Sequence, residues 1–198
     1  MEFLETLKKR RSVYALSSKL DLSNKEIAKL VKDVVTETPS AFNMQSGRVV
    51  VLFGEEHKKL WHITTETLRK IVPADKFAPT EAKMKMFSSG AGTIMFFEDE
   101  AVVDDYKAKF KTYASAFDMF ASHGLGILQG NIWNALAAKG IGANLQHYNP
   151  LIDEEVKKTW NIPASYRLVS EMVFGNVEEV PAPVEKMDPN DRVKVFGA

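Results

Sequence analysis

Two groups of cationic side chains in this sequence could bind a phosphate. Arg10, Arg11 and Ser12 are consecutive, and guanidinium forks beside a hydroxyl suit phosphate oxygens. Arg192 and Lys194 stand two residues apart, so a strand there would turn both cations to one face. Each group also has a plainer interpretation. An arginine pair after a helix suits the negative end of the helix dipole, and the second group also fits an ordinary surface charge pair.

A third group carries amides in place of charges. The stretch from Thr38 to Ser46 contains Asn43 and Gln45, which would share a face if a strand begins early. Carboxamides offer both donor and acceptor edges, which suit a flat heteroaromatic ring better than a metal or a phosphate. The alternative is a polar connection between a helix that stops before Pro39 and the strand that follows.

Composition and spacing exclude or disfavour several other functions. The chain has no cysteine, which excludes disulfides, thiolate catalysis and cysteine-ligated metal sites. No metal-binding histidine pair, catalytic-serine motif or glycine-rich nucleotide motif occurs. Lys+Arg and Asp+Glu both number 26, so no net charge favours nucleic acid or an anionic membrane. Neither a signal peptide nor a bilayer-spanning apolar run is visible, which predicts a cytoplasmic protein.

Hydrophobic periodicity predicts the elements that must position these groups. Ser23 and Glu26 form a capping box ahead of an apolar helical stripe, and Gly140 follows a long helix as its C′ residue. The expected helices cover residues 2–9, 23–38, 55–72, 81–87, 101–109, 117–139 and 152–160, and the expected strands cover residues 48–53, 93–97 and 167–174. Strands alternating with longer helices indicate one layered α+β or α/β domain over residues 1–198.

Three further features carry expectations about packing. The continuous apolar run at residues 48–53 predicts a strand covered on both faces. Glycines 124, 126 and 130 inside the long helix predict a close backbone approach, most simply to another helix. The proline-rich tail at residues 176–198 alternates apolar side chains near its end, which predicts addition to a sheet edge of its own chain or of a second subunit.

The order of the groups along the chain resembles the nitroreductase family of flavoproteins. The resemblance rests on Arg10–Val13, on Pro39–Ser46 and on Gly140–Asn144, and it extends over nearly the whole chain. Residues 40–61, 146–152 and 192–196 are similar to one branch, the fungal fatty-acid-repression-type nitroreductases and their small bacterial relatives. The resemblance implies an α+β sheet-and-helix fold in an intertwined homodimer, with FMN bound in clefts at the subunit interface.

The resemblance also implies a chemistry. NADH or NADPH reduces the flavin and leaves, and a nitroaromatic or quinone acceptor then takes the electrons in a ping-pong cycle. Because the hydride chemistry belongs to the flavin, no catalytic side chain and no metal is expected.

Residue roles follow from the same resemblance. Arg10 and Ser12 are expected to hold the FMN phosphate with Arg11 beside them, and Arg192 and Lys194 are expected to complete that site.

The remaining roles concern the flavin ring. Asn43 and Gln45 are expected to meet the ribityl chain and the ring edge from the other subunit, and the backbone of Leu145, Gln146 and His147 is expected to lie against the ring near N5. The sequence departs from the family pattern in two places. Tyr14 stands where many members have a basic residue, and His147 stands where many have Gly or Glu, so only a backbone role transfers there.

Two rival hypotheses belong to other functional classes. One is a flavin-binding regulatory or sensor protein in lipid or stress responses with little turnover. The other is a structural α+β module without a cofactor. A flavin spectrum and a turnover assay separate the three hypotheses.

Overall fold

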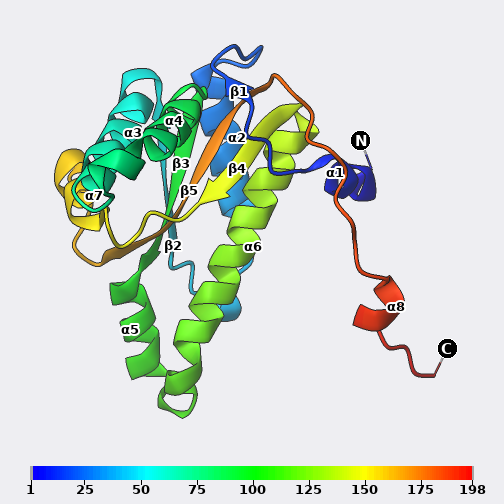
Figure 1. Ribbon diagram of the computed structural model, residues 1–198. Coiled ribbons are helices and arrows are strands. Elements are labelled where there is room, and N and C mark those ends of the chain that lie inside the picture. Colours follow the sequence, from blue (N-terminus) through cyan, green and yellow to red (C-terminus); the bar gives the residue numbers. More distant parts are fainter. Residues whose placement is uncertain (1, 198) are drawn as a thin grey trace.

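The computed structural model describes residues 2–197, and within them the centre of the fold is an antiparallel sheet (Figure 1). The strands are β1 (Leu16–Ser17), β2 (Gly47–Phe53), β3 (Gly92–Asp99), β4 (Ile141–Gln146) and β5 (Tyr166–Val177). Their order is β1-β5-β3-β2, and β4 pairs with the side of β5 away from β3. Every pair of these strands is antiparallel, so the fold is α+β.

Helices cover both faces of the sheet (Figure 1). The helices are α1 (Phe3–Lys9), α2 (Asn24–Glu37), α3 (Gly54–Arg69), α4 (Phe77–Ser88), α5 (Glu100–Lys109), α6 (Phe117–Ala138), α7 (Asp153–Trp160) and α8 (Pro189–Arg192), with 3₁₀ turns η1 (Ala41–Asn43), η2 (Ala74–Lys76) and η3 (Lys111–Ala116). Ile94 and Phe96 of β3 join the core under α2 and α6, while Met95 and Phe97 join the core under α3 and α7. This alternation is the period of two that a strand between two layers requires.

An arm made of α5, η3 and the first turns of α6 projects beyond the sheet (Figure 1). Its interior is aromatic, because Phe117 is buried among the rings of Tyr106, Phe110 and Phe120. Met44, from the connection ahead of β2, is buried in the same cluster. The arm is therefore packed against the Thr38–Ser46 stretch.

Most predicted helices are confirmed, with shifts at their ends. The capping box of α2 is present: the Glu26 N–H donates to Ser23 Oγ at 3.3 Å, and the Ser23 N–H donates to Glu26 Oε2 at 2.8 Å. The long helix ends as expected, with Gly140 at a φ of 77°. Helix α4 begins four residues before the predicted start because Pro79 lies in its first turn, where a backbone N–H is not needed.

The strand at residues 48–53 packs against a core on each face, as predicted: Val49, Val51 and Phe53 contact the core under α2 and α6, and Val50 and Leu52 contact the core under α3 and α7. Most of its side chains are only half-buried, because within residues 2–197 β2 is an edge strand paired only with β3. The other strand predictions need two corrections. Strand β5 runs through Gly175, where a Cβ would lie 2.4 Å from the Ser17 carbonyl oxygen. The sequence pattern missed β1 and β4 altogether, and β4 is the strand nearest the candidate site.

The predicted close approach at the α6 glycines holds at one position. A Cβ on Gly124 would lie 3.6 Å from Ser40 Cβ, so the helix approaches the Thr38–Ser46 stretch and not another helix. Within residues 2–197, nothing lies within 4 Å of the corresponding positions at Gly126 and Gly130, so the prediction is wrong there for this single chain.

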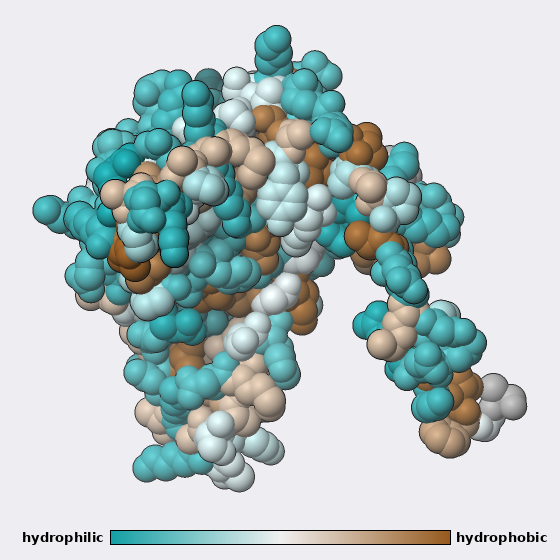
Figure 2. All heavy atoms as spheres, viewed as in Figure 1, coloured by the Kyte–Doolittle hydropathy of each residue, from teal (hydrophilic) through white to brown (hydrophobic). Residues whose placement is uncertain are grey.

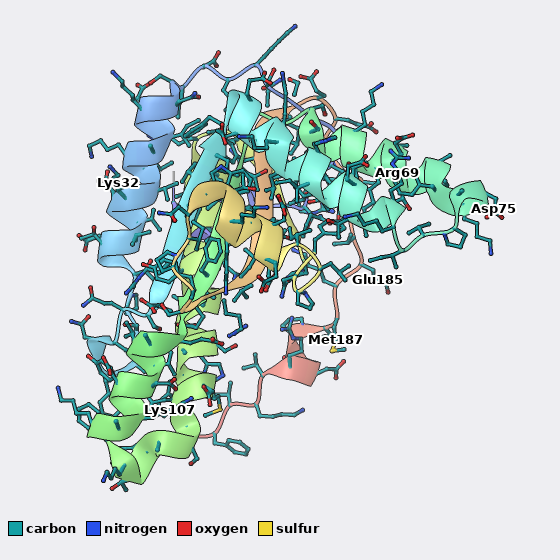
Figure 3. All side chains as sticks on the ribbon, turned by 90° about the vertical axis from the view of Figure 1, so that its left-hand side faces the viewer. Lys32, Arg69, Asp75, Lys107, Glu185 and Met187 are labelled. Atoms are coloured by element: carbon teal, nitrogen blue, oxygen red, sulfur yellow. The ribbon has the colours of Figure 1, made fainter. Side chains whose placement is uncertain are left out.

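The tail leaves the sheet after β5 and runs outside it (Figures 1 and 3). As far as residue 197, the tail beyond β5 forms only the short α8, and Val193, Val195 and Phe196 are exposed, with Phe196 at 92%. Figure 2 shows apolar atoms on this detached segment. Addition of the tail to its own sheet is therefore wrong for the described residues, while addition to a second subunit stays a prediction.

None of the helices in residues 2–197 has the length and apolar character needed to cross a membrane.

Candidate functional site

The cluster Arg10–Ser12 lies where α1 ends and the chain reaches the sheet. The guanidinium carbon of Arg10 stands 4.5 Å from the ring centre of Trp133 on α6, within the range of a cation–π contact. Ser12 forms a parallel bridge with Ala143 of β4. The cluster is thus held against both the long helix and the outer side of β4.

Backbone groups of alternate β4 residues face this outer side, and Ala143 uses them to pair with the segment after α1. The Val13 N–H donates to the Ala143 carbonyl at 2.9 Å. Residues two apart in a strand turn their backbone groups to the same edge, so the N–H and C=O of Leu145 face this edge as well. Gln146 turns its backbone toward β5, and its side-chain amide donates to Asn144 Oδ1 at 2.9 Å. The predicted phosphate cluster and the predicted ring-facing backbone therefore lie along one edge.

A cavity of about 180 Å³ adjoins this edge. It is bounded by Arg11, Trp133, Gly142 and Val180 among others. Arg11 donates from Nη2 to the Ala182 carbonyl at 2.8 Å, which fastens the start of the tail over the cavity. The cavity borders the start of β4 at Ile141 and Gly142, at the end of the strand away from Leu145, and its lining combines cations with an aromatic ring and aliphatic side chains.

The Thr38–Ser46 stretch folds into a tight turn with an unusual backbone. Phe42, Asn43 and Gln45 have φ values of 55°, 52° and 51°, in the left-handed region. Asn tolerates this region, but for most L-residues it costs roughly 1–2 kcal/mol each. Because β2 begins only at Gly47, the predicted shared strand face of Asn43 and Gln45 is wrong. Both residues are exposed on the turn instead.

Polar contacts inside the turn fix Gln45 in particular. Its N–H donates to Ser40 Oγ at 2.8 Å, and its side-chain Nε2 donates to the Asn43 carbonyl at 3.3 Å. A cavity of about 140 Å³ lies between this turn and α6, bordered by Arg48 and Phe120. The connection therefore has a defined and restrained conformation, and its role in binding a ring stays a prediction.

Within residues 2–197, the turn and the segment at the β4 edge contact α6 at different levels. The turn meets α6 at Gly124, and Arg10 meets it at Trp133, nine residues further along the helix. At about 1.5 Å per residue, these contacts are roughly 13 Å apart along the axis. The predicted ring-edge residues and the predicted phosphate residues thus stand at different levels of α6.

The predicted cations of the tail are also separate from the first cluster. Arg192 and Lys194 are exposed in or after α8, which Figure 1 shows well apart from α1. Lys194 Nζ donates only locally, to the Asn190 carbonyl at 3.3 Å. Within the described chain, the tail does not complete the first cluster.

Sequence reasoning missed a buried acid behind β4. Glu171 of β5 is fully buried opposite Gln146, and its Oε2 accepts from the Tyr148 N–H at 3.0 Å. Burial is the main cause that raises the pKa of Glu171 to about 8, and Asp153 adds to it. Glu171 therefore supports the segment that directly follows the β4 edge. The sequence does contain a signal for this residue, because an acid stands inside the otherwise apolar run at residues 167–174.

Two histidines show contrasting environments. His57 is buried with Nδ1 2.8 Å from Thr93 Oγ1, and burial lowers its pKa to about 4. His147 is exposed directly after β4. Among residues 2–197, no three His, Cys, Asp or Glu side chains are grouped as a metal site requires.

Comparisons with known proteins agree on one family. The Nitroreductase family model matches residues 7–176. The Saccharomyces cerevisiae protein HBN1 is 38% identical over 196 residues, which are 98% of this chain and 96% of HBN1. Nitroreductase CinD from Lactococcus lactis has been solved with chloramphenicol, at 40% identity to this chain, and with 4-nitrophenol, at 41% identity. Both alignments cover 98% of this chain and 100% of CinD, with a TM-score of 0.90.

A more distant structure shares the fold. A protein from Exiguobacterium sibiricum, solved in complex with FMN, has a TM-score of 0.71 at 17% identity, with coverage of 99% of this chain and 98% of that one.

Replacing Glu171 with Gln tests the buried acid. The pKa of Glu171 in the folded chain is about 8, above the ordinary value of 4.5. Its contribution to the stability of the fold is therefore fully present below about pH 4.5 and is lost as the pH rises through 8. Glutamine stays neutral and can still accept from Tyr148. We expect Glu171→Gln to raise Tm relative to the natural chain by about 10 °C more at pH 8.5 than at pH 5, because the raised pKa corresponds to about 4 kcal/mol between these pH values and each kcal/mol shifts Tm by about 2–4 °C in a chain of this size.

Thermal unfolding followed by circular dichroism measures both values. Glu154→Gln, an exposed acid on α7, is the control and should leave the pH dependence unchanged. A Tm difference for Glu171→Gln that is the same at both pH values would contradict the assignment.

Proposed function

The chain belongs to the nitroreductase family, and on that premise we propose that it is an FMN-dependent oxidoreductase that uses NADH or NADPH to reduce a nitroaromatic or a quinone. The observation that carries this proposal is the meeting of Arg10–Ser12 with the open edge of β4. Cations beside the outward-facing backbone of Leu145 on the same edge would match the two chemical ends of a flavin mononucleotide.

The donor set fits the phosphate end of FMN. Arg10 and Ser12 would hold the phosphate, with Arg11 beside them. The Trp133 ring, whose centre lies 4.5 Å from the Arg10 guanidinium carbon, restricts the Arg10 side chain. The guanidinium therefore loses less conformational freedom when it binds an anion. Tyr14 is exposed and supplies no cation, so the arginines would carry the phosphate charge within this segment.

The donor set also fits the ring end. The Leu145 N–H on the open edge would donate to the ring near N5, and Gln146 is held behind it by Asn144. His147 would contribute through its backbone. Bound FMN would accept a hydride from the reduced nicotinamide and pass electrons to the acceptor, so the protein's part is to bind, orient and supply donors.

The ring-edge amides would come from a second subunit. The approach of Ser40 to Gly124 and the contact of Arg10 with Trp133 lie roughly 13 Å apart along α6. The family resemblance assigns the amides that meet one flavin ring to the other subunit. A homodimer with two equivalent clefts would unite them. The tail, with Arg192 and Lys194, would pack on the partner and complete the phosphate site there.

The acceptor class rests on relatives. CinD was solved with chloramphenicol and with 4-nitrophenol, both of which carry a nitro group on an aromatic ring. We propose the same class of acceptor, with quinones as a second class because both are flat electron-poor rings.

FMN binding is tested first. The purified protein is expected to be yellow with a flavin spectrum, or to become so when FMN is added. Arg10→Ala combined with Arg192→Ala should reduce FMN affinity at least tenfold, because each change removes a phosphate cation. Arg69→Ala, at an exposed arginine of α3, is the control. A colourless protein that FMN does not reconstitute would refute the function, and unchanged affinity in the double variant would refute the phosphate assignment.

Turnover separates the enzyme from a flavin sensor. We expect rapid oxidation of NADH or NADPH when 4-nitrophenol or a quinone is added, with parallel lines in double-reciprocal plots from the ping-pong order. Stopped assays with both nicotinamides measure the preference. Bound FMN with negligible oxidation of either nucleotide would favour the sensor.

We predict that assembly of the homodimer depends on residues 178–198, the part of the tail beyond β5. Removing them should weaken the dimer, because Val193, Val195 and Phe196 are exposed in the single chain and would be buried on a partner. Sedimentation of the full and shortened chains over a concentration series measures the dissociation constant. Equal constants would show that the tail does not contribute.

A further inference from the structure

The turn that carries Asn43 and Gln45 needs restraint from outside itself. Three of its residues lie in the left-handed region without a glycine among them. Such a conformation persists only where surrounding structure determines it. Two separate sets of contacts supply that restraint, one from the sheet and one from the arm.

The first anchor is Arg48, at the start of β2. Its Nη1 donates to the carbonyls of Gln45 at 2.6 Å and Gly47 at 3.3 Å. Its Nε donates to Tyr166 Oη at 3.0 Å, and its Nη2 donates to Asp99 Oδ2 at 2.9 Å. The guanidinium thus connects the turn to β3 and β5.

Asp99 is itself fixed. It is largely buried, its Oδ1 accepts from Ser165 Oγ at 2.9 Å, and its N–H donates to the Ser46 carbonyl at 3.0 Å. Arg48 therefore has a rigid partner on the sheet. Because the Arg48 donors point to these acceptors, the side chain is unsuited to binding the phosphate.

The second anchor is Phe42, whose ring enters the aromatic arm. Its ring centre lies 5.0 Å from that of Phe110, 5.7 Å from Tyr113 and 5.4 Å from Phe117. The distances are typical of favourable aromatic pairs. Phe42 is still 46% exposed, so its contacts fasten the turn without making it part of the core.

We propose that Arg48 and Phe42 are positioning residues that hold the Asn43 and Gln45 carboxamides in place for the flavin ring. The inference rests on the proposed FMN function and deepens it. A turn ordered before the ligand arrives loses little freedom on binding, so the restraint appears as FMN affinity. Arg48 acts through the turn and does not touch the flavin.

The experiment compares FMN affinity in matched backgrounds. Apoprotein is titrated with FMN and the flavin fluorescence is followed, at a temperature where circular dichroism shows each variant folded. Arg48→Ala should raise Kd at least tenfold. Arg48→Lys should not restore affinity, because one ammonium cannot replace the planar fork that reaches four acceptors in fixed directions. Phe42→Ala should also raise Kd.

A double-mutant cycle separates positioning from other roles. Asn43→Gly with Gln45→Gly removes both carboxamides while keeping residues that accept a positive φ. In that background Arg48→Ala should change Kd less than twofold, because the groups it positions are gone. An equal effect in both backgrounds would overturn the inference, since Arg48 would then act directly or through overall stability.

Controls and a second variant keep the outcomes distinct. Arg69→Ala is the matched control: Arg69 also binds carboxylates and lies 4.3 Å over a ring, that of Phe77, and Figure 3 shows it far from the arm that carries Lys107. If Arg48→Ala does not fold, Ser40→Ala removes the acceptor of the Gln45 N–H and should raise Kd in the same way.

Two failures are distinguishable. A natural chain that binds no FMN overturns the proposed function and this inference with it. If the natural chain binds FMN but Arg48→Ala, or its substitute Ser40→Ala, has the same Kd for FMN as Arg69→Ala, the positioning role alone is overturned.

Discussion

Hydrogen bonding along β5 is the constraint on which the rest of the structure depends. This strand pairs with β3 on one side, with β4 on the other, and with β1 at its far end. Its pairing with β4 exposes the outer edge of β4 to the segment that carries Ser12. The same pairing places Glu171 beneath the residues that follow β4. One strand thus determines both the open edge and its buried support.

The sequence predicted the elements whose signals are local. The Ser23 capping box and the apolar runs of β3 and β5 contain their own evidence, because caps and burial act over a few residues. Strand β4 was missed since its Gly-Ala-Asn centre has low strand propensity and is extended only because β5 pairs with it. The left-handed turn at residues 42–45 was missed because no glycine marks it.

The candidate site was less predictable from the sequence than the helices and strands were. Residue types alone suggested phosphate and ring binding at separate places, and only the family resemblance ordered them into one site. The structure brings Arg10–Ser12 to β4 through a single parallel bridge between segments more than a hundred residues apart. No local pattern encodes that bridge. The roles of Arg48 and Asp99 were also invisible, since an ion pair across two strands depends on register.

The edge position of β2 has a consequence for the solubility of the chain. Its outer side offers unpaired backbone groups next to a Val-Val-Val-Leu-Phe run of high strand propensity, the type of segment that adds strands from other molecules. Arg48 stands at the head of this run, and a charge at that position opposes such growth. Arg48 thus occupies the position at which a charge flanks such a run, in addition to tying the turn to the sheet.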